Sequence, residues 1–135
     1  MNMEPREIIL DGNRFDTLEG FYKEAAKVLT NRPGFTPGRN LDALADLLGG
    51  GFGVHNSGEP ITLVWKNAAK SRRDLGYRAA ERHYKAQLAA HPERTAVLLP
   101  KLRAAKKKKG PTLFDRITRV IQDPNADHRV ELRLE

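Results

Sequence analysis

Hydrophobic residues along this 135-residue chain follow two spacings, and each spacing predicts one kind of element. Short apolar runs bounded by turn residues are typical of strands, whereas apolar residues three or four positions apart are typical of helices that bury one face. The runs predict a buried strand at 6–10, a second strand at 61–65 and a half-exposed edge strand at 129–134. These three strands lie far apart in the sequence, so long connections must join them.

Helical spacing fills the intervals between the predicted strands. Asp16 or Thr17 is placed to cap the first helix, Asn40 a short second one and Thr112 the last. Pro100 is expected to break or kink a helix that otherwise runs from 93 to about 108. The expected helices cover 18–29, 41–48, 67–75, 77–90, 93–108 and 113–121. Strands joined through helices pair in parallel, so we expect an α/β fold with a small three-stranded parallel sheet flanked by helices.

Composition narrows the class of protein further. A chain of 15.2 kDa is the usual size of one domain, and the absence of cysteine excludes disulfide scaffolds, thiolate metal sites and cysteine nucleophiles. No segment has the length and apolar character of a membrane span, and the first residues are not those of a signal peptide, so we expect a cytoplasmic protein. The histidines show no metal-ligand spacing and are predicted to be isolated surface residues, namely His55, His83, His91 and His128. No cofactor is indicated.

The formal net charge of +7 is unevenly distributed along the chain. Residues 1–60 contain six Lys and Arg against nine Asp and Glu, whereas residues 61–135 contain 18 against eight. Most of the excess lies between Lys66 and Lys109, with 14 basic and three acidic residues. A pI near 9.9 is typical of proteins that bind nucleic acid, but the acidic first half calls for its own explanation.

Asp42 and Asp46 form the most distinctive pair of charged residues in the acidic half. They are four positions apart in a predicted helix whose buried face is made of leucines, so both carboxylates must project from the opposite face. Like charges at this spacing repel each other by a few tenths of a kcal/mol. The pair is either an ordinary solvated helix face, a metal or acid/base pair, or an acidic surface for a basic partner.

The residues around this pair read Gly-Arg-Asn-Leu-Asp-Ala-Leu-Ala-Asp-Leu-Leu, from Gly38 to Leu48. Together with the preceding strand and helix and the following loop and strand, this segment resembles the barstar family of ribonuclease inhibitors. In that family a Gly-x-Asn-Leu-Asp-Ala-Leu-x-Asp helix follows a loop that carries aromatic and glycine residues. The resemblance covers residues 6 to about 74 and, by topology, 112–134.

The resemblance implies one barstar-like domain over residues 1–135, with extra helices between the second and third strands as an insertion at about 76–110. It also implies a non-enzymatic protein of the immunity type, monomeric when free, whose partner is a ribonuclease or related nuclease. Two carboxylates on a rigid helix can then occupy a cationic active site in place of an RNA phosphate. The partner-binding residues implied are Asp42, Asp46, Phe35, Arg39, Asn40, Ala45, Gly50 and Phe52.

Three features depart from the family pattern. Ala45 stands where the best-known members carry an aromatic residue, and the family's further acidic contact has no match near the start of the last helix, at Pro111 and Thr112. Those members are also acidic throughout, whereas this chain is basic. The basic segment therefore supports an alternative function, a nucleic-acid-binding module that uses the Lys66–Lys109 face. The residues that would contact nucleic acid are Lys101, Arg103, Lys106, Lys107, Lys108 and Lys109.

Overall fold

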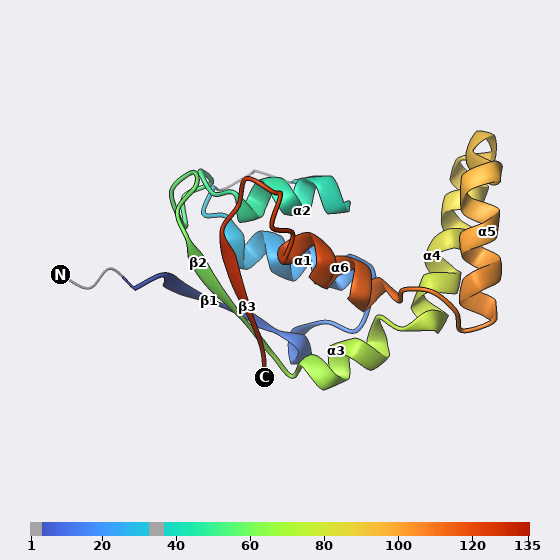
Figure 1. The fold of residues 1–135 in the computed structure, drawn as a ribbon, viewed down its shortest axis with the longest axis horizontal. Helices are drawn as coiled ribbons and strands as arrows, with labels where there is room; N and C mark the ends of the chain where they lie inside the picture. Colours follow the sequence, from blue (N-terminus) through green and yellow to red (C-terminus); the bar gives the residue numbers. More distant parts are fainter. Residues whose placement is uncertain (1–3, 33–36) are drawn as a thin grey trace.

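A three-stranded parallel sheet lies at the centre of the protein, for which a computed structural model describes residues 4–32 and 37–135 (Figure 1). The strands are β1 (Arg6–Asp11), β2 (Ile61–Lys66) and β3 (Val130–Leu134), in the order β1-β2-β3. Ile8 pairs with Leu63 and Leu63 with Leu132, so apolar residues of all three strands share the face that packs on the core. The predicted fold class, the parallel pairing and the edge position of the last strand are confirmed.

The helices α1, α2 and α6 cover one side of this sheet, whereas α4 and α5 form a hairpin at the far end of the molecule (Figure 1). Short 3₁₀ turns occupy Gly12–Arg14 and Pro92–Arg94. The helices are α1 (Leu18–Leu29), α2 (Leu41–Leu48), α3 (Ala68–Asp74), α4 (Tyr77–Ala90), α5 (Thr95–Lys106) and α6 (Leu113–Ile121). Among the described helices, none combines the length and apolar character needed to cross a membrane.

Trp65 is the centre of the hydrophobic core. Its ring stacks on Phe21 at a centroid distance of 5.4 Å and lies 5.0 Å from the ring of Phe114. The buried indole N–H donates a hydrogen bond of 3.0 Å to the Ser71 hydroxyl. The core thus joins α1, α3 and α6 to the middle strand and satisfies the one polar group of the tryptophan.

Side-chain caps fix where the helices of this layer begin. The hydroxyl of Thr17 accepts from Gly20 N–H at the start of α1, and the amide oxygen of Asn40 accepts from Ala43 N–H at the start of α2. At α6, Thr112 and Asp115 form a reciprocal capping box. The caps at Asn40 and Thr112 are as predicted, and Thr17 rather than Asp16 caps the first helix.

Two local expectations were wrong. The first strand is not buried on both faces, because β1 lies at an edge of the sheet and leaves the Ile9 side chain 49% exposed. Pro100 does not break α5, which runs through it without interruption. Pro100 and Ala96 are both exposed, so water can satisfy the Ala96 carbonyl that a proline four residues later leaves unpaired.

Two of the four histidines are buried rather than on the surface. The exposed fractions of His55 and His128 are 4% and 6%. The Nε2 atom of His55 lies 2.9 Å from the Leu48 carbonyl at the end of α2, and that of His128 lies 3.1 Å from the Ile121 carbonyl at the end of α6. Each ring thus satisfies carbonyls that a helix leaves unpaired at its C-terminal end.

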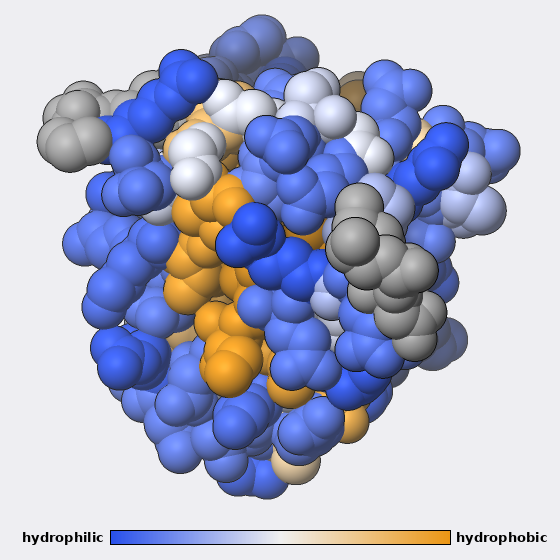
Figure 2. Space-filling view, turned by 90° about the vertical axis from the view of Figure 1, so that its left-hand side faces the viewer, coloured by the Kyte–Doolittle hydropathy of each residue, from blue (hydrophilic) through white to orange (hydrophobic). Residues whose placement is uncertain are grey.

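The side of the molecule that carries the strands is mainly hydrophilic, with one band of hydrophobic residues (Figure 2). Charged residues lie on the outer face of the sheet, where Arg133 on β3 forms ion pairs with Glu7 at 3.2 Å and Glu131 at 3.6 Å. The Arg133–Glu7 pair connects the two edge strands across the outer face of β2, whereas Glu131 lies on the same strand as Arg133.

Contacts at the base of the α4–α5 hairpin fix its position against the rest of the molecule. The hydroxyl of Tyr77 at the start of α4 donates to the Gly110 carbonyl at 2.7 Å. Arg116 on α6 donates to the buried Tyr84 hydroxyl on α4. Leu98 and Leu102 of α5 join the main core cluster. The hairpin therefore packs on the body through both polar and apolar contacts.

Candidate partner-binding site

The helix α2 presents two carboxylates on a rigid support. Leu44, Leu47 and Leu48 are buried against the core, which leaves Asp42 and Asp46 exposed on the opposite face. The contacts of α2 with α1 and α6 hold this helix on the body. The orientation predicted from the leucine spacing is therefore confirmed.

Neither Asp42 nor Asp46 forms an ion pair with any other residue in the described part of the chain. Asp42 lies in the first turn of α2, where the helix dipole favours a negative charge, but Asp46 lies in the second half, where it does not. The two like charges are four positions apart and repel each other by a few tenths of a kcal/mol. The face thus keeps two carboxylates that internal contacts do not neutralise.

The other predicted residues of α2 have more local roles. Asn40 caps the helix, and Ala45 is half-buried beside the two aspartates. Arg39 forms an ion pair with Glu19 on α1, which directs its guanidinium along the body. Phe35 lies outside the described residues.

The loop that follows α2 is held close to the helix end by backbone hydrogen bonds. Gly50 N–H donates to the Leu47 carbonyl at 3.2 Å, and Gly58 N–H donates to the Gly49 carbonyl at 2.7 Å. Gly50 has a φ of +88°, and a Cβ atom placed on it would lie 2.2 Å from the Asn56 carbonyl oxygen. Only glycine fits at this position, so the loop has a defined path beside the acidic helix.

Phe52 lies in this loop, half-buried and packed against the core. The guanidinium of Arg32 lies 5.8 Å from the centroid of its ring and donates to the Gly51 carbonyl at 2.7 Å. The Phe52 carbonyl accepts from Asn31 N–H at 2.8 Å. The predicted loop residues Gly50 and Phe52 are thus positioned next to the end of α2.

Asp115 is a carboxylate in the first turn of α6, and its side chain caps that helix. Its Oδ2 atom accepts from Thr112 N–H at 3.0 Å, and its own N–H donates to the Thr112 hydroxyl at 3.1 Å. This capping box stabilises the helix end that leads back toward α2. Asp115 therefore does not add a free carboxylate to those of α2.

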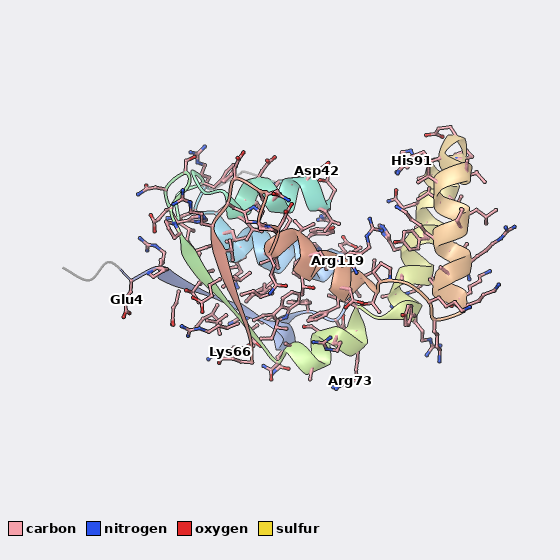
Figure 3. All side chains as sticks on the ribbon, viewed as in Figure 1. Glu4, Asp42, Lys66, Arg73, His91 and Arg119 are labelled. Carbon is pink, nitrogen blue, oxygen red and sulfur yellow. The ribbon has the colours of Figure 1, made fainter. Side chains whose placement is uncertain are left out.

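The basic segment from Lys66 to Lys109 does not form one face. Figure 3 shows Lys66 and Arg73 at the lower side of the molecule, away from Asp42 and the start of α2. The Lys70 ammonium is bound to Asp74 at 2.6 Å and to two carbonyl oxygens, and the Arg72 guanidinium lies 4.6 Å from the centre of the Phe114 ring. Exposed cations gather at the end of α5 and just after it, namely Arg103, Lys106, Lys107, Lys108 and Lys109.

Lys101 belongs to a different environment, a cleft of about 370 Å³ between the hairpin and the helices α1, α2 and α6. Asp42 lines this cleft from α2, and Arg116 lines it from α6. Sequence reasoning did not find the cleft, because Arg116 occupies a polar position of an amphipathic helix, as surface arginines usually do. Only the tertiary packing of the hairpin brings these charges together.

A metal centre is not supported by the described residues, which contain no cluster of three or more potential ligands. The pair of aspartates on α2 therefore lacks the further ligands that a divalent cation would need. The geometry defines an α/β protein with two exposed carboxylates on a helix and a half-buried loop beside the end of that helix.

Comparison with known proteins identifies the family to which this architecture belongs. Residues 6–85 match the family described as Barstar (barnase inhibitor), so the chain is a member of the barstar family. The matched region contains the sheet strands β1 and β2, the acidic helix α2 and the first part of α4. The search of curated proteins found no match. Members of this family are inhibitors that bind ribonucleases.

Proposed function

We propose that this protein inhibits a ribonuclease or related nuclease by placing Asp42 and Asp46 of α2 in the cationic active site of the enzyme. The observation that carries this proposal is the pair of exposed carboxylates that lack an ion-pair partner in the described structure. Family membership supports it, because the family is described as one of barnase inhibitors.

The proposed mode of binding follows from charge and rigidity. A nuclease active site holds cationic side chains that bind the RNA phosphate, and carboxylates at fixed positions can pair with them. Since α2 is anchored by buried leucines, little conformational freedom is lost when its carboxylates bind. The loop containing Gly50 and Phe52 adds backbone groups beside Asp46, and RNA is excluded while the inhibitor is bound.

We further propose that the chain forms one barstar-like domain and acts as a monomer without enzymatic activity. In this interpretation the chain between about residues 76 and 110 is an insertion into the family core, and the family match extends into its first part as far as residue 85. The main core cluster runs from β1 through the hairpin to α6, which supports one domain rather than two.

The test is inhibition of a panel of small microbial ribonucleases by the intact chain and by two variants. Asp46→Ala is expected to weaken inhibition by roughly 30-fold or more, because removing one partner of a buried charge pair costs about 2–5 kcal/mol. That range includes measurements on the barnase–barstar pair, the reference complex of this family. Alanine is a better helix former than aspartate, so the substitution is expected to leave α2 folded.

Asp127→Ala is the matched control, because Asp127 is exposed, lies outside α2 and carries the same charge. It is expected to leave inhibition unchanged. Inhibition that is equally sensitive to both substitutions would indicate a nonspecific charge effect and would contradict the proposal. So would the absence of inhibition across the panel.

The competing function is nucleic-acid binding through the basic segment between Lys66 and Lys109. The exposed lysines that follow α5 favour it, but Lys70 and Arg72 are engaged in internal contacts. RNA binding that falls steeply with salt and is lost when Lys106–Lys109 are neutralised would support this function. If Asp46→Ala left that binding unchanged, and no nuclease were inhibited, the inhibitor proposal would be overturned.

A further inference from the structure

The cleft between the α4–α5 hairpin and the body has the size of a small-molecule site. Its volume is about 370 Å³, and sites for small ligands typically measure about 300–1,000 Å³. Figure 3 shows Asp42 at the end of α2 that faces the hairpin. Buried Leu98, Leu113 and Ile117 contribute apolar surface to its lining. The cleft is therefore part of the folded structure and not a surface irregularity at a loop.

Three cationic side chains line this cleft: Arg94 from the 3₁₀ turn before α5, Lys101 from α5 and Arg116 from α6. None of the three has an ion-pair partner among the described residues. Burial lowers the pKa of Lys101 below its ordinary value, and the neighbouring Arg116 and Arg94 lower it further. Three like charges thus lie around a partly desolvated cleft in which Asp42 is the one lining carboxylate among the described residues, and an anionic ligand would offset the remaining positive charge.

The packing of the hairpin on α6 holds Arg116 in place. Its guanidinium donates to the Tyr84 hydroxyl and lies 5.9 Å from the centre of the same ring. Tyr84 is buried in the core, so it limits the positions that the guanidinium can take. A guanidinium fixed in this way keeps further N–H donors for an oxyanion, and its planar donor geometry suits phosphate.

The other polar side chains of the cleft suit the uncharged, polar part of such a ligand. Asn40 and Asp42 line the cleft from α2, and Gln87 lines it from α4. Asp42 accepts hydrogen bonds, and the two amides both donate and accept them. His83, which also lines the cleft, has its pKa lowered by burial and then by Arg116 and Lys101, so the imidazole is mainly neutral at pH 7.

We propose that this cleft binds a nucleoside monophosphate, with Arg94, Lys101 and Arg116 on the phosphate and the polar residues of α2 and α4 on the nucleoside. Three cations and one carboxylate leave the cleft with a positive balance that a phosphate monoester offsets. The hydroxyl and amino groups of a nucleoside place donors away from the phosphate, where they can reach Asp42 while the phosphate binds the cations. The site is distinct from the face that presents Asp46, although Asp42 borders both.

The experiment is calorimetric titration of the full chain with adenosine 5′-monophosphate and guanosine 5′-monophosphate, with adenosine and inorganic phosphate as comparisons. We expect at least one nucleotide to bind with one-to-one stoichiometry, at least tenfold more tightly than adenosine or inorganic phosphate. Because a nearby anion favours the protonated imidazole, bound nucleotide is also expected to raise the pKa of His83 in an NMR titration. This readout uses the unaltered protein and needs no variant to fold.

Variants assign the binding to the cleft. Lys101→Gln and Arg116→Gln are each expected to weaken nucleotide binding about tenfold or more, since each removes a charge-assisted hydrogen bond. Lys85→Gln is the matched control, because Lys85 is exposed on α4 and does not line the cleft. No saturable binding up to millimolar nucleotide would overturn the proposal, as would equal affinity for inorganic phosphate or an equal loss in Lys85→Gln.

Discussion

Gly50 allows a direct test of the loop geometry beside the acidic helix. The substitution Gly50→Ala adds a single Cβ atom at a residue whose φ is +88°, in a region that side-chain-bearing residues rarely adopt. That atom would lie 2.2 Å from the Asn56 carbonyl oxygen and 2.9 Å from the His55 ring. Both neighbours are held by the same loop, so the backbone must move to admit the methyl group.

The expected loss in the free energy of unfolding has two contributions, and a matched substitution separates them. A positive φ costs a residue with a Cβ atom roughly 1–2 kcal/mol, and forcing a methyl group into a filled space costs about 1–3 kcal/mol more. Gly58 lies in the same loop with a φ of +75°, but a Cβ there would have no described atom within 4 Å. Gly58→Ala is therefore expected to lose about 1–2 kcal/mol, and Gly50→Ala about 2–5 kcal/mol.

Urea denaturation of the two variants and the unaltered chain measures both free energies of unfolding. Equal slopes of the three unfolding curves would indicate that the same surface becomes exposed in each case. The larger loss for Gly50→Ala isolates the steric contribution of the Asn56 carbonyl. If the two variants lost the same free energy within error, the close approach at Gly50 would be wrong and the reasoning refuted.

Two further predictions concern the core and the cleft. Ser71→Ala leaves the buried Trp65 N–H without its acceptor and is expected to cost about 1–3 kcal/mol in urea denaturation; a loss no larger than that of exposed Ser57→Ala would contradict it. The pKa of His83 is lowered below 6.5 in the folded chain, so the unfolded chain binds the proton more readily. From pH 7.5 to 5.5 the unaltered protein should therefore lose more stability than His83→Gln, and equal losses would disprove this.

The fold was predictable because its signals are local. Leucine spacing and the Asn40 cap define α2 within a few residues, and alternating residues in a short segment define β3. The burial of His55 was not predictable, since it depends on the distance between its ring and the Leu48 carbonyl in the folded loop. The exposure of Ile9 likewise depends on the position of β1 at the sheet edge, which an apolar run of three residues does not reveal.

The candidate site was also only partly predictable from the sequence. Asp42 and Asp46 were found from their spacing because a single helix fixes their relative positions. The cleft was not found, because Lys101 and Arg116 come from helices that are separated in sequence by a turn and meet Asp42 only after the hairpin has packed. Residues that converge from several elements leave no periodic pattern in the sequence.

The net charge of +7 is consequently a poor guide to what a partner encounters. Charges are screened over about 8–10 Å at physiological ionic strength, so a partner approaching α2 responds mainly to groups near that helix. Lys66 and Arg73 lie on another side of the molecule from Asp42 (Figure 3). The cations of the cleft, by contrast, line the same cleft as Asp42. Under the proposed function, a uniformly cationic enzyme surface would be attracted by Asp46 and repelled next to Asp42. The arrangement therefore favours a nuclease whose basic residues are confined to its active site, and it disfavours one whose whole surface is basic.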